Sequence, residues 1–330
     1  MSLKVHSLIY ASMIGTLLGT TPALAQAPLE LVQTIPLPDV RGRIDHLAID
    51  LDSERLFVAA LGNDSVEVID LRAGRHSARL EHLQEPQGVA YIAETKRLFV
   101  ANGRSGRLDV FVGPELAPAG HVRGLEDADN IRYDKGSGQI YVGYSSVLAA
   151  IDVATSEMVH QVKLAGHPES FQLETTGSRI FINVPSAGQI AIVDRNKGSV
   201  MATWPLDDMK ANFPMALDEP NHRLFIATRR PAALLVYDTE NGKRVASLAS
   251  CGDADDLFFD AETKRIYAIC GQGVVDVVQQ RDVDHYETAT QVTTAPGART
   301  GLFARSRKSL YVAVPARAAS LAEIRVYAVR

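Results

Sequence analysis

The chain has 330 residues, of which 46% are hydrophobic and 22% are charged, and its formal net charge at pH 7 is −5. These proportions are ordinary for a globular protein, and the mild acidity argues against nucleic acid and anionic membrane surfaces as partners. With only two cysteines, the chain is not a disulfide scaffold.

The first residues have the features of a secretory signal peptide. Lys4 precedes an apolar run over 8–18, and the small residues Ala23-Leu24-Ala25 follow it. This pattern is typical of a signal peptide that is removed after the small residues. The run is too short to span a bilayer, which takes about 20 apolar residues. We predict a cleaved signal peptide over 1–25, a single domain over 26–330 and a periplasmic or secreted location; a retained N-terminal anchor is the alternative.

Next along the chain comes a predicted strand over Glu30–Leu37, and then seven copies of one pattern. In each copy a polar turn leads into a strand of the form polar, aliphatic, aromatic, aliphatic, as in Arg55-Leu56-Phe57-Val58. The copies begin at Arg55, Arg97, Gln139, Arg179, Arg223, Arg265 and Ser309. They recur about every 42 residues, and such a period with β-type alternation is typical of a four-stranded propeller blade.

The remainder of each unit supplies further strands. Val66–Asp70 is a third strand, and Arg244–Leu248 is an example of a fourth, reached through a glycine-containing turn. The sequence therefore predicts an all-β fold, a seven-bladed β-propeller with four-stranded antiparallel blades. The seventh unit has a third strand at Glu323–Val329 and none after it. We predict that Glu30–Leu37 pairs into this last blade, closes the ring and removes exposed sheet edges.

The strand pattern also resembles a known repeat. An aliphatic-aromatic-Val strand followed by Val66-Glu67-Val68-Ile69-Asp70 is similar to the YVTN-type repeat of YncE-like periplasmic bacterial proteins. The resemblance covers essentially all of 26–330, although only Phe99-Val100-Ala101-Asn102 keeps the final Asn of the repeat. Similar propellers serve as binding proteins, surface proteins and parts of enzymes, so the resemblance implies a fold and supplies no catalytic motif.

Residues just before each innermost strand are expected to converge on one mouth of the central channel. Aligning the units gives one column of Asp45, Gln87, Asp129, Glu169, Phe213, Asp255 and Arg299. Flanking positions and the loops after the second strands add Arg43, His46, Asn130, His167, Asp256, Arg104 and Arg229. We predict that these residues bind a small polar ligand.

Carboxylates that point at one axis repel each other and lose hydration, which raises their pKa values unless a cation lies among them. Asp129, Glu169 and Asp255 are the candidate ligands of a divalent metal. Their oxygens suit Ca²⁺ or Mg²⁺, whereas His46 or His167 would suit a transition metal. The alternative is that these polar side chains tie the blades together by hydrogen bonds, with nearby arginines neutralising the acids.

Three functions fit this mouth. The first is a ligand-binding propeller. The second is a metal-assisted lactonase-like hydrolase or a lyase, with Glu169, Asp255, His46 and His167 as candidates for proton transfer. The third is a platform for another exported protein, for which Tyr144 and Phe213 are the aromatic candidates. The sequence has no haem, flavin or nucleotide motif, so we expect none of these cofactors.

Cys251 and Cys270 both belong to the sixth unit. An oxidising compartment favours a disulfide between them. Strand pairing is expected to place Cys270 opposite Asp255, so the preceding loop must curl back to bring the two Cα atoms within bonding range. A disulfide and two free thiols both remain open.

Overall fold

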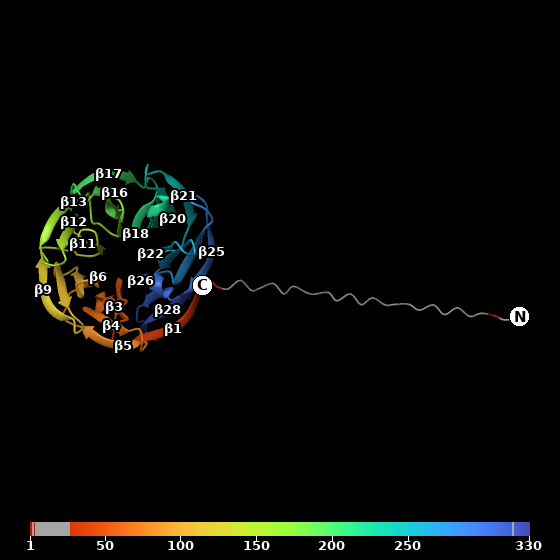
Figure 1. Cartoon of the computed structure of the whole chain (residues 1–330), viewed down its shortest axis with the longest axis horizontal. Helices are drawn as coiled ribbons and strands as arrows, with labels where there is room; N and C mark the ends of the chain where they lie inside the picture. Colours follow the sequence, from red (N-terminus) through yellow and green to blue (C-terminus); the bar gives the residue numbers. More distant parts are fainter. Residues whose placement is uncertain (2, 4–26, 319) are drawn as a thin grey trace.

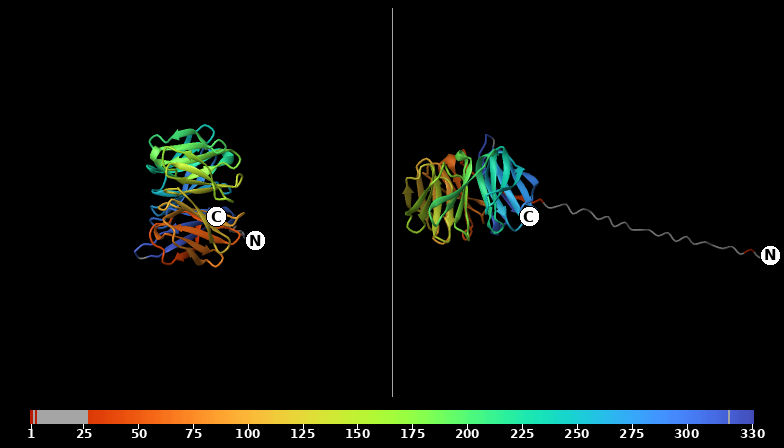
Figure 2. Two further views of the ribbon diagram at one scale, coloured as in Figure 1. Left: turned by 90° about the vertical axis from the view of Figure 1, so that its left-hand side faces the viewer. Right: turned by 90° about the horizontal axis from the view of Figure 1, so that it is seen from above.

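The computed structural model describes residues 1, 3, 27–318 and 320–330. Its strands form seven four-stranded antiparallel sheets arranged as blades around a central axis, seen end-on in Figure 1 and from the side in Figure 2. The predicted all-β, seven-bladed propeller is confirmed. The predicted signal peptide lies outside the described residues, apart from Met1 and Leu3. Within the described ranges, no helix is long and apolar enough to cross a membrane.

Each blade contributes an innermost strand and a second strand beside it. The innermost strands are β2 (Leu47–Asp50), β6 (Pro86–Ile92), β10 (Ile131–Asp134), β14 (Phe171–Leu173), β18 (Lys210–Asp218), β22 (Ala254–Asp260) and β26 (Gly301–Ala304). The second strands are β3 (Arg55–Ala60), β7 (Arg97–Asn102), β11 (Gln139–Tyr144), β15 (Arg179–Val184), β19 (Arg223–Arg230), β23 (Arg265–Cys270) and β27 (Ser309–Val314). The blades are numbered one to seven in this order.

The outer half of each blade holds two more strands. The third strands are β4 (Ser65–Asp70), β8 (Arg107–Val112), β12 (Val147–Asp152), β16 (Gln189–Asp194), β20 (Ala232–Asp238), β24 (Val274–Gln280) and β28 (Ala322–Val329). The outermost strands are β5 (Arg75–Leu80), β9 (Ala117–Arg123), β13 (Met158–Lys163), β17 (Ser199–Pro205), β21 (Arg244–Ala249), β25 (Tyr286–Thr293) and β1 (Leu29–Leu37). Short 3₁₀ turns lie at η1 (Leu61–Asn63), η2 (Pro185–Ala187), η3 (Glu219–Asn221) and η4 (Arg305–Arg307).

The ring is closed by the N-terminal strand, as predicted. β1 pairs antiparallel with β28, with Leu29 opposite Val329 and Leu37 opposite Ala322. Leu37 is fully buried at 0% exposure, and Glu30 forms an ion pair with Arg330 at 2.7 Å. Blade seven therefore combines the two ends of the propeller and covers a sheet edge that would otherwise be free.

The core lies between neighbouring blades, and the repeated aromatic residue of each second strand is at its centre. Every one of these rings is at most 2% exposed: Phe57, Phe99, Tyr141, Phe181, Phe225, Tyr267 and Tyr311. Phe181 of blade four, for example, shares a cluster with Leu224 and Ile226 of blade five. Because each blade has a neighbour on both faces, its second strand is buried on both sides and carries a continuous apolar run.

Candidate functional site

A β-bulge at the start of each innermost strand positions the site. In blade one, the Asp45 amide donates to Ala59 O at 2.7 Å and the Ala59 amide donates to His46 O at 3.0 Å, so two residues oppose one. The equivalent pairs are Gln87-Gly88, Asp129-Asn130, Glu169-Ser170, Phe213-Pro214, Asp255-Asp256 and Arg299-Thr300. A bulge bends the strand and re-aims a side chain. Here it directs the first member of each pair toward the axis.

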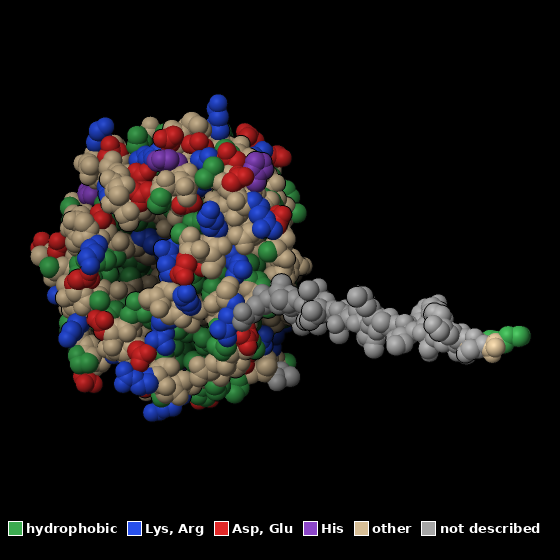
Figure 3. Space-filling model, turned by 45° about the vertical axis from the view of Figure 1, so that its right-hand side comes forward, with side chains coloured by type: hydrophobic (Ala, Val, Ile, Leu, Met, Phe, Trp, Pro, Cys, Tyr) green, Lys and Arg blue, Asp and Glu red, His purple; other side chains and the backbone are tan. Residues whose placement is uncertain are grey.

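The first members of all seven pairs line one cavity at a mouth of the channel. Its volume is about 340 Å³, and its walls also include Arg43, His46, Asp127, His167 and Arg229. The centre of the ring is visibly hollowed in the space-filling view (Figure 3). The structure thus brings together most of the residues that the repeat alignment placed in one column.

Three residues of the predicted site lie elsewhere. Asn130 is buried at 2% exposure, and Asp256 faces a deeper part of the channel. Arg104 does not reach the mouth, because its guanidinium is held by Glu85 at 2.6 Å and Asp64 at 3.4 Å beside a separate surface pocket.

Two acids of the mouth are not among the predicted site residues. They are Asp127 and Asp253, which lie two positions before Asp129 and Asp255 of the aligned column. Asp127 lines the cavity, and Asp253 bonds two of its arginines. Tyr144, the aromatic candidate for a protein-binding face, is buried at 6% exposure.

One side of the mouth holds a closed network of two arginines and two aspartates. Arg229 bonds Asp255 at 2.5 Å and Asp253 at 3.2 Å, and Arg299 bonds the same two carboxylates at 3.0 and 3.2 Å. The Arg229 guanidinium also lies 3.8 Å from the ring centroid of Phe213, within cation–π range. Burial and the nearby Asp45 raise the pKa of Asp255 to about 7. We call these four charged residues the arginine–aspartate network.

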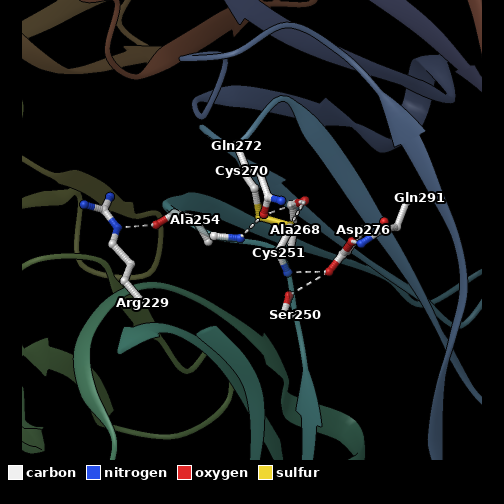
Figure 4. Close-up of a disulfide and its surroundings, with 10 residues drawn as sticks. Arg229, Ser250, Cys251, Ala254, Ala268, Cys270, Gln272, Asp276 and Gln291 are labelled. Carbon is white, nitrogen blue, oxygen red and sulfur yellow. Dashed lines mark hydrogen bonds between the residues drawn. A yellow bond between two sulfur atoms is a disulfide. The ribbon is translucent and has the colours of Figure 1, made fainter. Parts of the chain in front are cut away.

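A disulfide braces the loop that carries the two aspartates of this network. Cys251 and Cys270 are bonded, with their Cα atoms 5.9 Å apart (Figure 4). Asp276 accepts hydrogen bonds from the Cys251 amide at 2.8 Å and from Ser250 Oγ at 2.9 Å. The expected register was wrong by one residue: Cys270 lies opposite Ala254, because the bulge displaces Asp255 from the ladder.

His46 lies at the floor of the cavity among three carboxylates. Its Nδ1 is 3.4 Å from Asp256, and its Nε2 is 3.6 Å from Asp45 and 3.7 Å from Asp129. Burial lowers the pKa of His46, but the three carboxylates outweigh burial and raise that pKa to about 10. His46 is therefore an imidazolium at neutral pH, a state that does not suit a general base.

The other side of the mouth holds a group of metal-ligand type. Asp129, His167 and Glu169 offer ligand atoms that all lie within 4.8 Å of one another. His167 Nδ1 is 3.0 Å from the carbonyl oxygen of Ser145, which leaves Nε2 facing Asp129. A backbone acceptor on one ring nitrogen commonly fixes a metal-binding histidine in this tautomer. The third candidate metal ligand is thus His167 and not the predicted Asp255, because Asp255 is bonded within the arginine–aspartate network.

The two carboxyl groups of this trio have opposite pKa shifts. Burial and the charge of Asp129 raise the pKa of Glu169 to about 8. Burial opposes ionisation of Asp129, but His167 and His46 outweigh it and lower the pKa of Asp129. Asp129 Oδ1 is buried and has no hydrogen-bond partner among the described residues. Near neutral pH the trio thus contains one carboxylate and one carboxyl group that retains its proton.

Comparison with known proteins agrees with the fold and gives one sequence relative. No protein-family model matches the chain. The uncharacterized protein YncE of Salmonella typhimurium is 24% identical over 200 residues, which are 58% of this chain and 55% of YncE. The chain therefore spans little more than half the length of this curated relative.

Two solved structures share the fold at low sequence identity. A chain of Kuenenia stuttgartiensis hydrazine synthase has 16% identity and a TM-score of 0.73, covering 83% of this chain and 93% of that one. A chain of a mitotic checkpoint complex has 12% identity and a TM-score of 0.77, covering 98% and 99%. At this identity the likeness concerns the fold alone. Together with the seven blades, it shows that this chain is a β-propeller repeat protein, and in sequence the chain is similar to YncE.

Proposed function

We propose that this propeller binds a divalent transition metal at Asp129, His167 and Glu169, and uses it to hold a small polar ligand in the mouth cavity. The observation that carries the proposal is the convergence of these three ligand groups within 4.8 Å on one wall of the cavity. A cation there would replace the proton that Glu169 otherwise retains, and it would bond directly to the buried Asp129 Oδ1, which accepts no hydrogen bond from the described residues.

The donor set favours a particular class of metal. One imidazole and two carboxylates suit Mn²⁺, Fe²⁺ or Zn²⁺ better than Ca²⁺ or Mg²⁺, which prefer oxygen ligands alone. Three protein ligands leave coordination positions open toward the cavity for ligand oxygens.

The rest of the cavity limits the ligand. A space of about 340 Å³ accommodates a small molecule, and its walls are mainly polar or charged. Arg43, whose side chain is 44% exposed, lies at the rim; its Nη2 bonds Asp45 at 2.5 Å, and its other N–H groups can donate to a carboxylate or phosphate. The groups of the arginine–aspartate network already bond one another, so this side of the mouth suits hydroxyl or amide groups. A chelating, oxygen-rich molecule with one acidic group fits this arrangement best.

Calorimetric titration with Mn²⁺ and Zn²⁺ tests the metal site. Wild-type protein should bind one equivalent, and His167→Gln and Glu169→Gln should weaken that binding by about ten- to a hundred-fold or more. His285→Gln is the matched control, since His285 pairs with Asp282 at the surface. Equal metal affinity in wild type, His167→Gln and Glu169→Gln would refute the site. The metal-loaded protein can then be screened by thermal shift against small hydroxy acids, sugar acids and amino acids.

One observation favours a second candidate, a metal-assisted hydrolase of the lactonase type or a lyase. Neighbouring carboxyl groups whose pKa values are driven apart, as in Glu169 and Asp129, can serve as acid and base. Turnover of a lactone or uronate substrate that is lost in Glu169→Gln, with metal affinity measured alongside, would favour the enzyme. Ligand binding without turnover would favour the binding protein.

We also propose that the protein is exported. The N-terminal pattern and the buried disulfide both support an oxidising compartment. Free-thiol titration of protein taken from the periplasm and unfolded without reductant should find no free cysteine, whereas two reactive thiols would oppose this location.

A further inference from the structure

Beyond His46 the central channel holds a second chamber. It has a volume of about 300 Å³ and shares His46 with the mouth cavity above it. On the other side it shares Gln172, Leu257 and Phe258 with a pocket that opens farther along the channel. The chamber is thus separate from the proposed metal site, and the protonated His46 lies between the two.

The innermost strands present one equivalent residue each at the level of this chamber, opposite the buried aromatic of the second strand. These residues are Ala48, Ala90, Arg132, Gln172, Ala216, Phe258 and Leu302. Six of the seven are uncharged, and Arg132 is the exception. A propeller needs no cation at this position, since the other six blades form the same pairing without one.

Arg132 has no direct counterion among the described residues. Its Nη1 donates to the carbonyl of Ile131 at 2.8 Å, and its Nη2 lies 3.5 Å from Ser170 Oγ. Asp256, on the chamber wall, is engaged by His46 and accepts from the Gly301 amide at 2.8 Å. Arg132 is half-buried, and its guanidinium lies 5.6 Å from the ring centroid of Phe171. A charge that is largely removed from water normally also has a hydrogen-bonded partner of opposite charge.

Arg132 carries a positive charge at every physiological pH. Burial lowers its pKa from the ordinary value, and the more distant Asp256 and Asp129 partly offset this effect. A guanidinium nevertheless stays protonated in proteins at every physiological pH. The chamber therefore contains a permanent positive charge with donor groups directed into a space large enough for a small ion.

We propose that this chamber is a binding site for a compact monovalent anion, a halide or a small carboxylate, held by Arg132. Ser170 Oγ and the side-chain amide of Gln172 also line the chamber. Gln172 Nε2 donates to Met215 O at 3.0 Å and has a second N–H, and the Ser170 hydroxyl has its own hydrogen to donate. Apolar walls from Leu47, Val89 and Leu257 favour a weakly hydrated anion over a multiply charged one.

Chloride NMR line width tests the proposal on the purified, folded protein. Chloride that exchanges with a protein site gives a broadened line, and formate added to the sample should narrow it by competition if both anions use the same site. The broadening should be lost in Arg132→Gln and largely kept in Arg132→Lys. It should be unchanged in Arg72→Gln, the matched control, whose side chain is 79% exposed and paired with Glu54.

Two results would overturn the proposal. One is equal broadening in wild type and Arg132→Gln, with circular dichroism showing that the variant is folded. The other is broadening that survives Arg132→Gln but is lost in Arg43→Gln, which would place the anion in the mouth. If the chloride line is broadened and formate does not narrow it, the site is restricted to halides. That result would refute the part of the proposal that concerns small carboxylates. Because Glu169→Gln should leave the broadening intact, failure of the metal proposal is distinguishable from failure of this one.

Discussion

His46 connects three blades by its charge, since its carboxylate neighbours come from blades one, three and six. Asp45, Asp129 and Asp256 would repel one another without the imidazolium between them. The pKa of His46 is raised from 6.5 to about 10, so its stabilising contribution is fully present below about pH 6.5. That contribution is lost as the pH rises through about 10. His46 is thus better described as a structural cation than as a catalytic base.

Replacing His46 with Gln should therefore destabilise the protein strongly. Removing one partner of a buried charged group typically costs about 3 kcal/mol or more. Asp256→Asn in the same chain removes one of the carboxylates left unpaired, so the double variant should recover part of the loss. Denaturant unfolding near pH 7 measures both effects. Additive losses in the double variant would show that the two residues are not coupled.

Repeat alignment was sufficient to predict that the seven residues of one column share the mouth, because each occupies the same position in its blade. It was not sufficient to predict how those side chains pair. Asp255 and Glu169 occupy equivalent positions, yet two arginines bond the first, and no arginine among the described residues forms an ion pair with the second. The position of Arg104 was predicted wrongly for the same reason, since the repeat pattern does not indicate that Glu85 of its own blade and Asp64 of the preceding blade bond its guanidinium.

At the scale of single elements, the loop before β22 determines the arginine–aspartate network. Cys251–Cys270 fixes the start of this loop, and the bulge at Asp255 directs the carboxylate toward the axis. The disulfide could be given only as one of two outcomes from sequence, because it depends on how the loop curls, which the strand pattern does not specify. The strands themselves were predictable, since their apolar runs follow from burial between blades.

Converting both cysteines to Ala should lower the free energy of unfolding by about 3 kcal/mol, given a separation of 19 residues. Thermal unfolding with and without reductant measures this change. Reductant should have no effect on the double variant and should bring wild type close to it. A wild type that is insensitive to reductant even when unfolded would contradict the disulfide.

The closing strand β1 should contribute to stability through its buried face alone. Leu37→Ala removes a side chain at 0% exposure and should cost about 3 kcal/mol. Leu31→Ala, at 49% exposure in the same strand, should cost less than about 0.5 kcal/mol. Denaturant midpoints of the two variants check the difference. Equal midpoints would mean that ring closure does not depend on packing of this strand.

For the whole molecule, the seven-fold ring brings residues that are more than 200 positions apart in the sequence to one axis. Which side chains meet in the mouth therefore depends on which blades are neighbours. Blades three and four supply the metal-type trio, and blades five, six and seven supply the arginine–aspartate network. The two halves of the mouth therefore differ in charge although the backbone repeats. The sequence predicted the ring, whereas the division of the mouth into two unlike halves depends on side-chain contacts between blades.

This uneven charge makes global stability depend on pH in a defined direction. Glu169 and Asp255 have pKa values raised to about 8 and about 7, so the folded state binds more protons than the unfolded state between about pH 4 and those values. Stability must then fall as the pH rises through this window, by at most about 1.4 kcal/mol per pH unit for each group.

Unfolding by denaturant from about pH 5 to about pH 8 should show this decline in metal-free wild type. Glu169→Gln removes the contribution of Glu169 to this pH dependence, so the free energy of unfolding should fall less steeply with pH. The contribution of Asp255 remains. Saturating Mn²⁺ should reduce the slope in wild type in the same way, because a metal bound at the trio displaces the Glu169 proton, and it should do much less in Glu169→Gln. Identical slopes in metal-free wild type and Glu169→Gln would show that this carboxyl group titrates normally, and the electrostatic argument for a cation at the trio would then fail.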